Sequence, residues 1–231
     1  MKKLILITSL STLLIACGGS DKVKDTAENT AKAGAEKVAE VAETTTKTLK
    51  DVATNTAVAT QGAIDKKAAV QEAKKITKAF GGALKKELKT AMKAGGPINA
   101  LDVCNTKANP IAEKAAADFN ASISRVSLKN RNPENVPNDW QKAVLENFEA
   151  RVAKGEDIKK MGFSEIVEHD GKKQLRFMKA LPTGGVCLEC HGSNIEADVQ
   201  AKITELYPED KAVGYEKGQI RGAVVILKDL N

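Results

Sequence analysis

Apolar side chains in residues 67–231 recur with two periods. Steps of three and four residues, which are typical of helices packed by one face, appear first over residues 70–92. The run Gly95, Gly96 and Pro97 ends that stretch, because glycine and proline interrupt helices and proline suits the first turn of a new one. The pattern predicts helices over residues 70–92, 97–106, 110–119, 139–154 and 195–206.

A two-residue alternation of apolar and polar positions marks the expected strands. Two such runs flank Asp170 and Gly171, a dipeptide that strongly indicates a β-hairpin. Because strands and helices do not alternate regularly along the chain, a parallel sheet is not expected. We therefore predict an α+β fold with an antiparallel sheet flanked by helices. Its strands are expected over residues 123–129, 163–168, 174–181 and 218–228.

Residues 1–16 have the pattern of an export signal. Lys2 and Lys3 precede an apolar stretch that is too short to span a membrane. Cys17 follows directly, an arrangement that resembles a bacterial lipoprotein signal, in which the cysteine is lipidated after cleavage. An ordinary signal peptide with an incidental cysteine is the alternative. The lipoprotein resemblance implies a lipid anchor in the cell envelope, facing the periplasm, and Gly18 after the cysteine favours the outer membrane.

Residues 17–66 carry Cys17 and are otherwise rich in Ala, Thr, Lys and Glu. Their apolar positions recur near helical spacing, but such small side chains are too weakly apolar to bury a core. We expect a helical or disordered tether that holds residues 67–231, the globular domain, away from the membrane. A coiled-coil dimerisation stalk is the alternative, although Ala and Thr pack little surface at seam positions.

The composition narrows the classes of partner. The chain has 231 residues, of which 42% are hydrophobic and 3% aromatic, so its core must be mainly aliphatic. The net charge of +6 is spread along the chain rather than clustered. Together with the few aromatic residues and the export signal, this argues against nucleic acid as a partner. A basic surface suits acidic redox partners or an anionic membrane.

The clearest chemical motif is Cys187-x-x-Cys190-His191. C-x-x-C-H is typical of covalent haem attachment, in which the two thiols add to the porphyrin vinyl groups. The histidine that follows is then placed to be the proximal axial ligand of the iron. A zinc half-site, a thioredoxin-like redox pair and a plain disulfide are the alternatives. The export signal favours haem, because this attachment takes place on the exported side of bacterial membranes.

The second axial ligand is open to several candidates. His169 lies at the expected hairpin tip, where exposure makes it a poor ligand. Cys104, on a predicted helix, is either a buried apolar cysteine or a ligand, since a free thiol is unusual in an exported protein. Methionine is a common ligand in electron-carrying cytochromes, but the methionines also suit a core. The candidates are Cys104, His169, Met92, Met161 and Met178, or no ligand.

Several runs taken together resemble a family of haem-binding c-type cytochrome domains with a PAS-like fold, found as exported proteins and as sensor modules. The runs are residues 100–105, 125–140, 187–192, 207–215 and 218–222, and the resemblance covers about residues 67–231. It implies one covalent haem c with His191 as the proximal and Cys104 as the distal ligand. It also implies that the run of residues 125–135 lies near the haem.

The basic residues of that run have two interpretations. Arg125, Lys129 and Arg131 are candidates for binding the haem propionates, because guanidinium–carboxylate pairs are strong and directional. The alternative is a solvated basic strand and loop.

Three functions fit this set of features. A thiolate ligand donates electron density and stabilises ferric iron, which favours a redox- or gas-responsive haem protein that acts with a signalling partner and binds a small gas when reduced. A low-potential periplasmic electron carrier is the alternative, and a structural haem-binding lipoprotein is a third. An enzyme is not expected, because no nucleophile–base or metalloprotease motif occurs in the sequence.

Overall fold

The computed structural model describes the backbone of residues 22–230 and the side chains of residues 43–52, 54 and 66–230. The predicted signal, residues 1–16, and Cys17 lie outside the described residues. Within the described part of the chain, no helix is long and apolar enough to cross a membrane. The chain divides into two units, Met1–Thr60 and Gln61–Asn231.

In the first unit, the described backbone is helical from Lys22 onward, as the beginning of α1, which spans Lys22–Phe119. The Thr48 hydroxyl donates to the Thr44 carbonyl at 2.9 Å, the bond to the preceding helical turn that threonine side chains make within a helix. Leu49 and Val52 are 64% and 58% exposed. The coiled-coil alternative stays a prediction.

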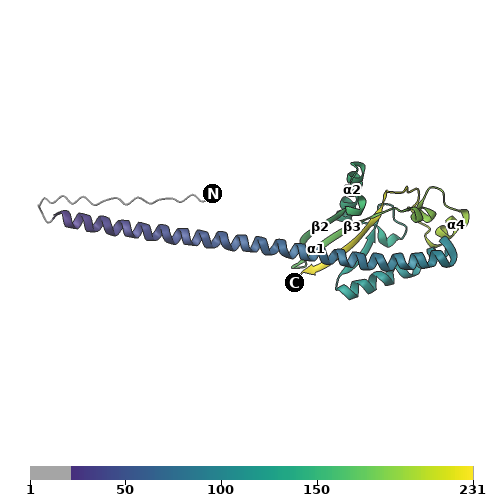
Figure 1. Cartoon of the computed structure of the whole chain (residues 1–231), viewed down its shortest axis with the longest axis horizontal. Helices are drawn as coiled ribbons and strands as arrows, with labels where there is room; N and C mark the ends of the chain where they lie inside the picture. Colours follow the sequence, from purple (N-terminus) through teal and green to yellow (C-terminus); the bar gives the residue numbers. More distant parts are fainter. Residues whose placement is uncertain (1–21, 231) are drawn as a thin grey trace, which may run out of the picture. The chain divides into compact units, whose positions relative to one another are not determined.

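In the second unit, α1 contains a sharp reversal. Gly95 (φ −162°, ψ 23°) and Gly96 (φ 66°, ψ −158°) leave the helical region, and the positive φ of Gly96 favours glycine. The Asn99 side-chain amide donates to the Ala91 carbonyl at 3.0 Å across this turn. The predicted stop at Gly95 and Gly96 is therefore confirmed, and the two helical arms lie side by side (Figure 1), with Lys107 paired to Glu87 at 3.2 Å.

The predicted break before Pro110 is wrong. The second arm of α1 continues through Pro110 to Phe119. A proline removes one backbone hydrogen bond from a helix, but packing on both sides can hold the segment helical. Ala108 and Ala115, which are 1% and 8% exposed, provide that packing.

The sheet is antiparallel throughout, in the order β1-β4-β3-β2. The hairpin between β2 and β3 turns at Asp170 (φ 50°) and Gly171 (φ 72°), as the dipeptide predicted. The helix α2 and the strands lie close to their predicted ranges, and the α+β expectation is confirmed. The bounds are β1 Ser122–Val126, α2 Asp139–Ala153, β2 Gly162–His169, β3 Lys172–Pro182 and β4 Ile220–Leu230.

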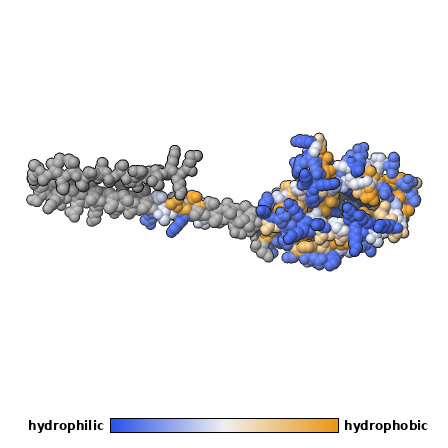
Figure 2. All heavy atoms as spheres, in the orientation of Figure 1, coloured by the Kyte–Doolittle hydropathy of each residue, from blue (hydrophilic) through white to orange (hydrophobic). Residues whose placement is uncertain are grey.

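Each face of the sheet has its own core, because alternate residues of a strand point to opposite sides. On one face, Ile76 and Phe80 of α1 pack with Phe177 and Ile226. On the other face, α2 contributes Val144, Leu145 and Phe148, which pack with Met178 and Val225. The result is a sheet between helical layers (Figure 1), the PAS-like arrangement, and hydrophilic side chains cover much of the visible outer surface (Figure 2).

A third apolar cluster lies at one end of the domain. Leu101 of α1 packs with Val199 and Ile203 of α4, which spans Ala197–Leu206, and Cys190 packs against this cluster. The Lys202 ammonium also pairs with the Asp102 carboxylate at 3.3 Å. These contacts dock the helical arm that carries Cys104 beside the short segments of the C-x-x-C-H motif. Those segments are η3, Gly185–Cys187, and α3, Leu188–His191.

Candidate cofactor-binding site

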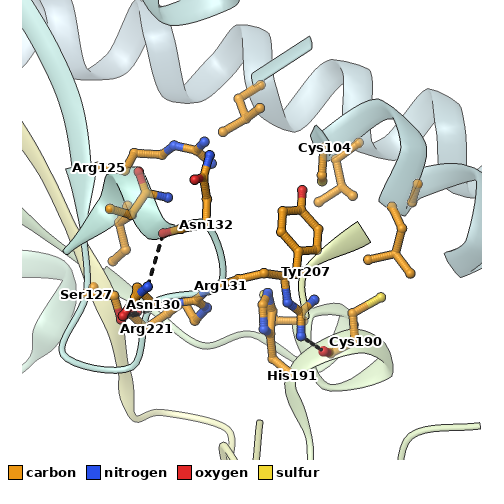
Figure 3. A pocket seen from close by; sticks show the side chains of 18 of the residues that line it. Cys104, Arg125, Ser127, Asn130, Arg131, Asn132, Cys190, His191, Tyr207 and Arg221 are labelled. Carbon is orange, nitrogen blue, oxygen red and sulfur yellow. Dashed lines mark hydrogen bonds between the residues drawn. The ribbon is translucent and has the colours of Figure 1, made fainter. Parts of the chain in front are cut away.

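One cavity gathers nearly all the predicted site residues. It has a volume of about 1240 Å³, including the part open to solvent, and lies between α1, the ends of β1 and β4 and the C-x-x-C-H segments. Figure 3 shows Cys104, Arg125, Arg131, Cys190 and His191 around it. The predicted site residues that line the cavity are Cys104, Arg125, Arg131, Cys187, Cys190 and His191.

His191 is held rigidly at the wall of this cavity. Its ring Nδ1 donates to the Ala212 carbonyl at 2.7 Å, and its backbone carbonyl accepts from Tyr215 N at 2.8 Å. Because the first bond places the ring proton on Nδ1, Nε2 keeps its lone pair. Burial lowers the pKa of His191 to about 2, with Arg221 and Arg131 adding to the effect. The imidazole is therefore neutral at pH 7, the form that binds metals.

A buried ion pair fixes the backbone around His191. The Arg131 guanidinium binds Asp210 in a fork, with Nε 3.1 Å from Oδ1 and Nη2 2.9 Å from Oδ2. Arg131 Nη2 also donates to the Cys190 carbonyl at 2.6 Å (Figure 3). Asp210 in turn accepts from the Ala212 backbone, whose carbonyl orients His191. Arg131 therefore positions the motif rather than reaching freely into the cavity.

The cysteines of the site are free thiols in partly buried positions. Cys187 accepts a hydrogen bond from Gly184 N at 3.3 Å. Burial raises the pKa of Cys190 to about 11, although Arg131 opposes the shift. Burial also raises the pKa of Cys104, opposed by Arg125 and Arg131. Without a metal or an electrophile to bind, these two thiols are therefore protonated at pH 7.

The structure separates the candidates for a second axial ligand. Cys104 and Met92 both line the cavity. Met161 and Met178 are fully buried in the core between the sheet and α2, so they fill the core as the apolar interpretation predicted. His169 lies at the hairpin tip beside Asp170, where its side chain is 55% exposed.

The basic residues also separate. Lys129 does not line the cavity: its ammonium donates to the Val213 carbonyl at 2.5 Å and lies 4.7 Å from the centre of the Tyr215 ring. Arg125 does line it. Arg221 lines it too and was missed from the sequence, although it falls in the Gly218–Gly222 run. Strand alternation alone could not have shown which way Arg221 points.

The described side chains form no group of three or more His, Cys, Asp or Glu residues that could hold a metal ion. Among the side chains that the structure describes, a zinc site built wholly from such ligands therefore has no counterpart. A haem makes a smaller demand, because the porphyrin supplies the equatorial ligands and the protein only the axial ones.

The fold and the cavity define a PAS-like domain with a C-x-x-C-H motif at the wall of its pocket. The chain belongs to the Tll0287-like family, whose model, described as Tll0287, matches residues 20–228. A solved structure, "Crystal structure of the cyanobacterial heme-protein Tll0287", shares the fold, with a TM-score of 0.51 and 22% sequence identity over 71% of this chain and 93% of that chain. A search of curated proteins finds no match.

The first prediction concerns the buried ion pair. Replacing Arg131 with Gln leaves Asp210 buried without its cation, which should lower the free energy of unfolding by about 3–5 kcal/mol. Urea denaturation of the purified variant measures this. Lys114→Gln is the control, because it removes an exposed pair with Asp118 and should change stability little. Equal effects of the two substitutions would contradict the role given to Arg131.

Proposed function

We propose that this chain is a haem-binding protein that carries one haem c, attached through Cys187 and Cys190. The observation that carries the proposal is the placement of both thiols and of His191, with Nε2 unprotonated, at the wall of one cavity. Membership of the Tll0287-like family supports it, as does the likeness to a solved structure that is itself a haem protein.

The residues of the cavity fit the group. Leu84, Leu88 and Leu181 form an apolar wall suited to a flat ring, while Arg125 and Arg221 supply positive charge suited to carboxylates. Arg221 lines the cavity, and its buried Nε has no hydrogen-bond partner among the described residues, so the protein itself does not satisfy every donor of this guanidinium. When bound, haem supplies reversible one-electron chemistry at its iron.

Two residues are proposed as axial ligands. His191 would bind through Nε2, because Nδ1 is engaged by Ala212. Cys104 would be the second ligand, in keeping with the family resemblance, and Met92 is the competing side chain on the same cavity. A thiolate favours ferric iron and is weakened as a ligand by reduction or protonation. This supports a redox- or gas-responsive protein that acts through a protein partner.

A low-potential electron carrier is the second candidate. Val186, next to the attachment cysteine Cys187, lines the cavity and is 52% exposed. Because Val186 both lines the cavity and reaches the surface, a cofactor attached at Cys187 would have one edge near the surface. Such an edge favours electron transfer to a docked partner. We assign no enzymatic activity to the chain.

We further propose that Cys17 is lipidated and anchors the protein in the cell envelope, facing the periplasm, with the outer membrane favoured by Gly18. The sequence pattern of residues 1–18 supports this.

Covalent attachment is tested by expression in a bacterium with c-type cytochrome maturation. The protein should keep its haem on a denaturing gel, detected by haem-dependent peroxidase staining. Cys187→Ala combined with Cys190→Ala should lose the stain entirely, because no thioether bond can form. Cys104→Ala is the matched control and should keep it. A wild-type protein that loses its haem on denaturation would contradict covalent attachment.

The axial ligand is tested by absorption and EPR spectra of the ferric protein. Cys104→Ala should abolish a low-spin thiolate spectrum, whereas Met92→Leu should leave it unchanged. A low-spin spectrum without thiolate character that is lost in Met92→Leu and kept in Cys104→Ala would assign the ligand to Met92. Carbon monoxide added to the reduced protein separates the two functions: rapid binding is expected of a gas-responsive protein, and refusal to bind favours the electron carrier.

Anchoring is tested by growing cells with a labelled fatty acid. The wild-type protein should carry the label and sediment with membranes, because several acyl chains anchor stably. Cys17→Ser should lose the label and appear in the soluble periplasmic fraction. Label on the serine variant would show that lipid is attached elsewhere.

A further inference from the structure

The cavity holds positive charge that the described protein does not balance. Arg125, Arg131 and Arg221 line it, and no Asp or Glu belongs to the described wall. Arg131 is neutralised by Asp210 just outside the wall, at 2.9 Å. No ion pair involving Arg125 or Arg221 occurs among the described residues. Since charges withdrawn from water are normally paired, the two remaining guanidiniums, which are half-buried, indicate a missing anion.

The hydrogen bonds of the Arg125 and Arg221 side chains support the same conclusion. Arg221 donates through Nη1 to the Ser127 hydroxyl at 3.1 Å and to the Lys129 carbonyl at 3.3 Å, but its buried Nε donates to nothing in the described chain. Arg125 makes no hydrogen bond with another described side chain or carbonyl. Burial lowers the pKa of both residues, which reflects the cost of holding these charges away from water.

The backbone brings these two groups to one cavity. Arg125 lies on β1 opposite Val224 of β4, and the neighbouring Val126 pairs with Ala223. Gly222 (φ 154°) comes next, and a Cβ atom there would lie 2.3 Å from the Val126 carbonyl. Only glycine permits that approach of the two strands. It leaves Arg221 beside the end of β1, at the same cavity as Arg125.

We propose that Arg125 and Arg221 form a carboxylate clamp that binds the two propionates of the haem. This rests on the proposed haem-binding function and adds the orientation of the cofactor. In a porphyrin bound through its vinyl groups, the propionates lie at the opposite edge. In Figure 3, Arg125 and Arg221 both lie on the side of the view away from Cys190, Arg221 with His191 between it and Cys190. Two guanidiniums also match the charge of two carboxylates.

The clamp assigns different roles to the basic residues of this region. Lys129 is engaged with Val213, and Arg131 is engaged with Asp210 and the Cys190 carbonyl. Neither is available for a propionate. Arg125 and Arg221 retain free donors, and guanidinium–carboxylate bonds are among the stronger polar contacts in proteins.

The clamp is tested in the full chain with Cys187→Ala and Cys190→Ala, which converts attachment into reversible binding. This protein is titrated with hemin and with hemin dimethyl ester, whose propionates carry no charge, and the dissociation constants are measured by absorption. Hemin should bind at least about tenfold more tightly than the diester, because charge-assisted hydrogen bonds are lost with the ester. Arg125→Gln and Arg221→Gln should each weaken hemin about tenfold and leave the diester nearly unchanged.

Arg151→Gln is the control for the loss of a positive charge, since Arg151 of α2 pairs with Glu156 and neither residue lines the cavity. It should preserve the preference for hemin. Equal binding of hemin and the diester to the parent protein would overturn the clamp and leave the proposed function intact. The same holds if Arg125→Gln keeps the full preference. Binding of neither compound would contradict the proposed function itself.

Folding is checked by thermal unfolding of the same proteins. Arg125 has no described partner to lose, so Arg125→Gln without ligand should melt at or above the temperature of the parent, and hemin should raise that temperature less than it does in the parent. Arg221→Lys keeps the charge but loses the planar fork, so its preference for hemin should be intermediate. A lower melting temperature of ligand-free Arg125→Gln would show that Arg125 is structural, against the clamp.

Discussion

The ion pair between Arg131 and Asp210 is the constraint on which the site depends. Its side chains are 9% and 7% exposed, so both charges lie away from water. Such a pair adds little net stability, because desolvation offsets much of the attraction, but it strongly disfavours any arrangement that separates the partners. It ties the segment after β1 to the Cys190 carbonyl and to the loop that orients His191.

The cavity therefore contrasts two kinds of arginine. Arg131 has its carboxylate inside the protein and holds the walls in place. Arg125 and Arg221 have no such partner in the described chain, and their charges face the space where a ligand would lie. A low dielectric makes an unpaired charge costly and a paired one strong. Burial makes the unpaired charges of Arg125 and Arg221 costly when no ligand is bound. The same burial would strengthen their attraction to an anionic cofactor.

Local signals predicted much of the fold. Asp170-Gly171 indicated the hairpin because both residues accept a positive φ, and Gly95-Gly96 indicated the end of a helical stretch because glycine interrupts helices. Pro110 misled, because the loss of one helical hydrogen bond was outweighed by packing around Ala108 and Ala115, which depends on residues distant in sequence.

The sequence by itself determined the C-x-x-C-H motif, the class of fold and the list of side chains that are candidates for a second ligand. Each follows from spacing within a short stretch. Only the tertiary structure decided which of these residues share a cavity. It placed Cys104 and Met92 there and Met161 and Met178 in the core. It also showed that Arg221 lines the cavity and that Lys129 does not. The direction of those side chains depends on the approach of β1 and β4 at Gly222, which is a contact between distant segments.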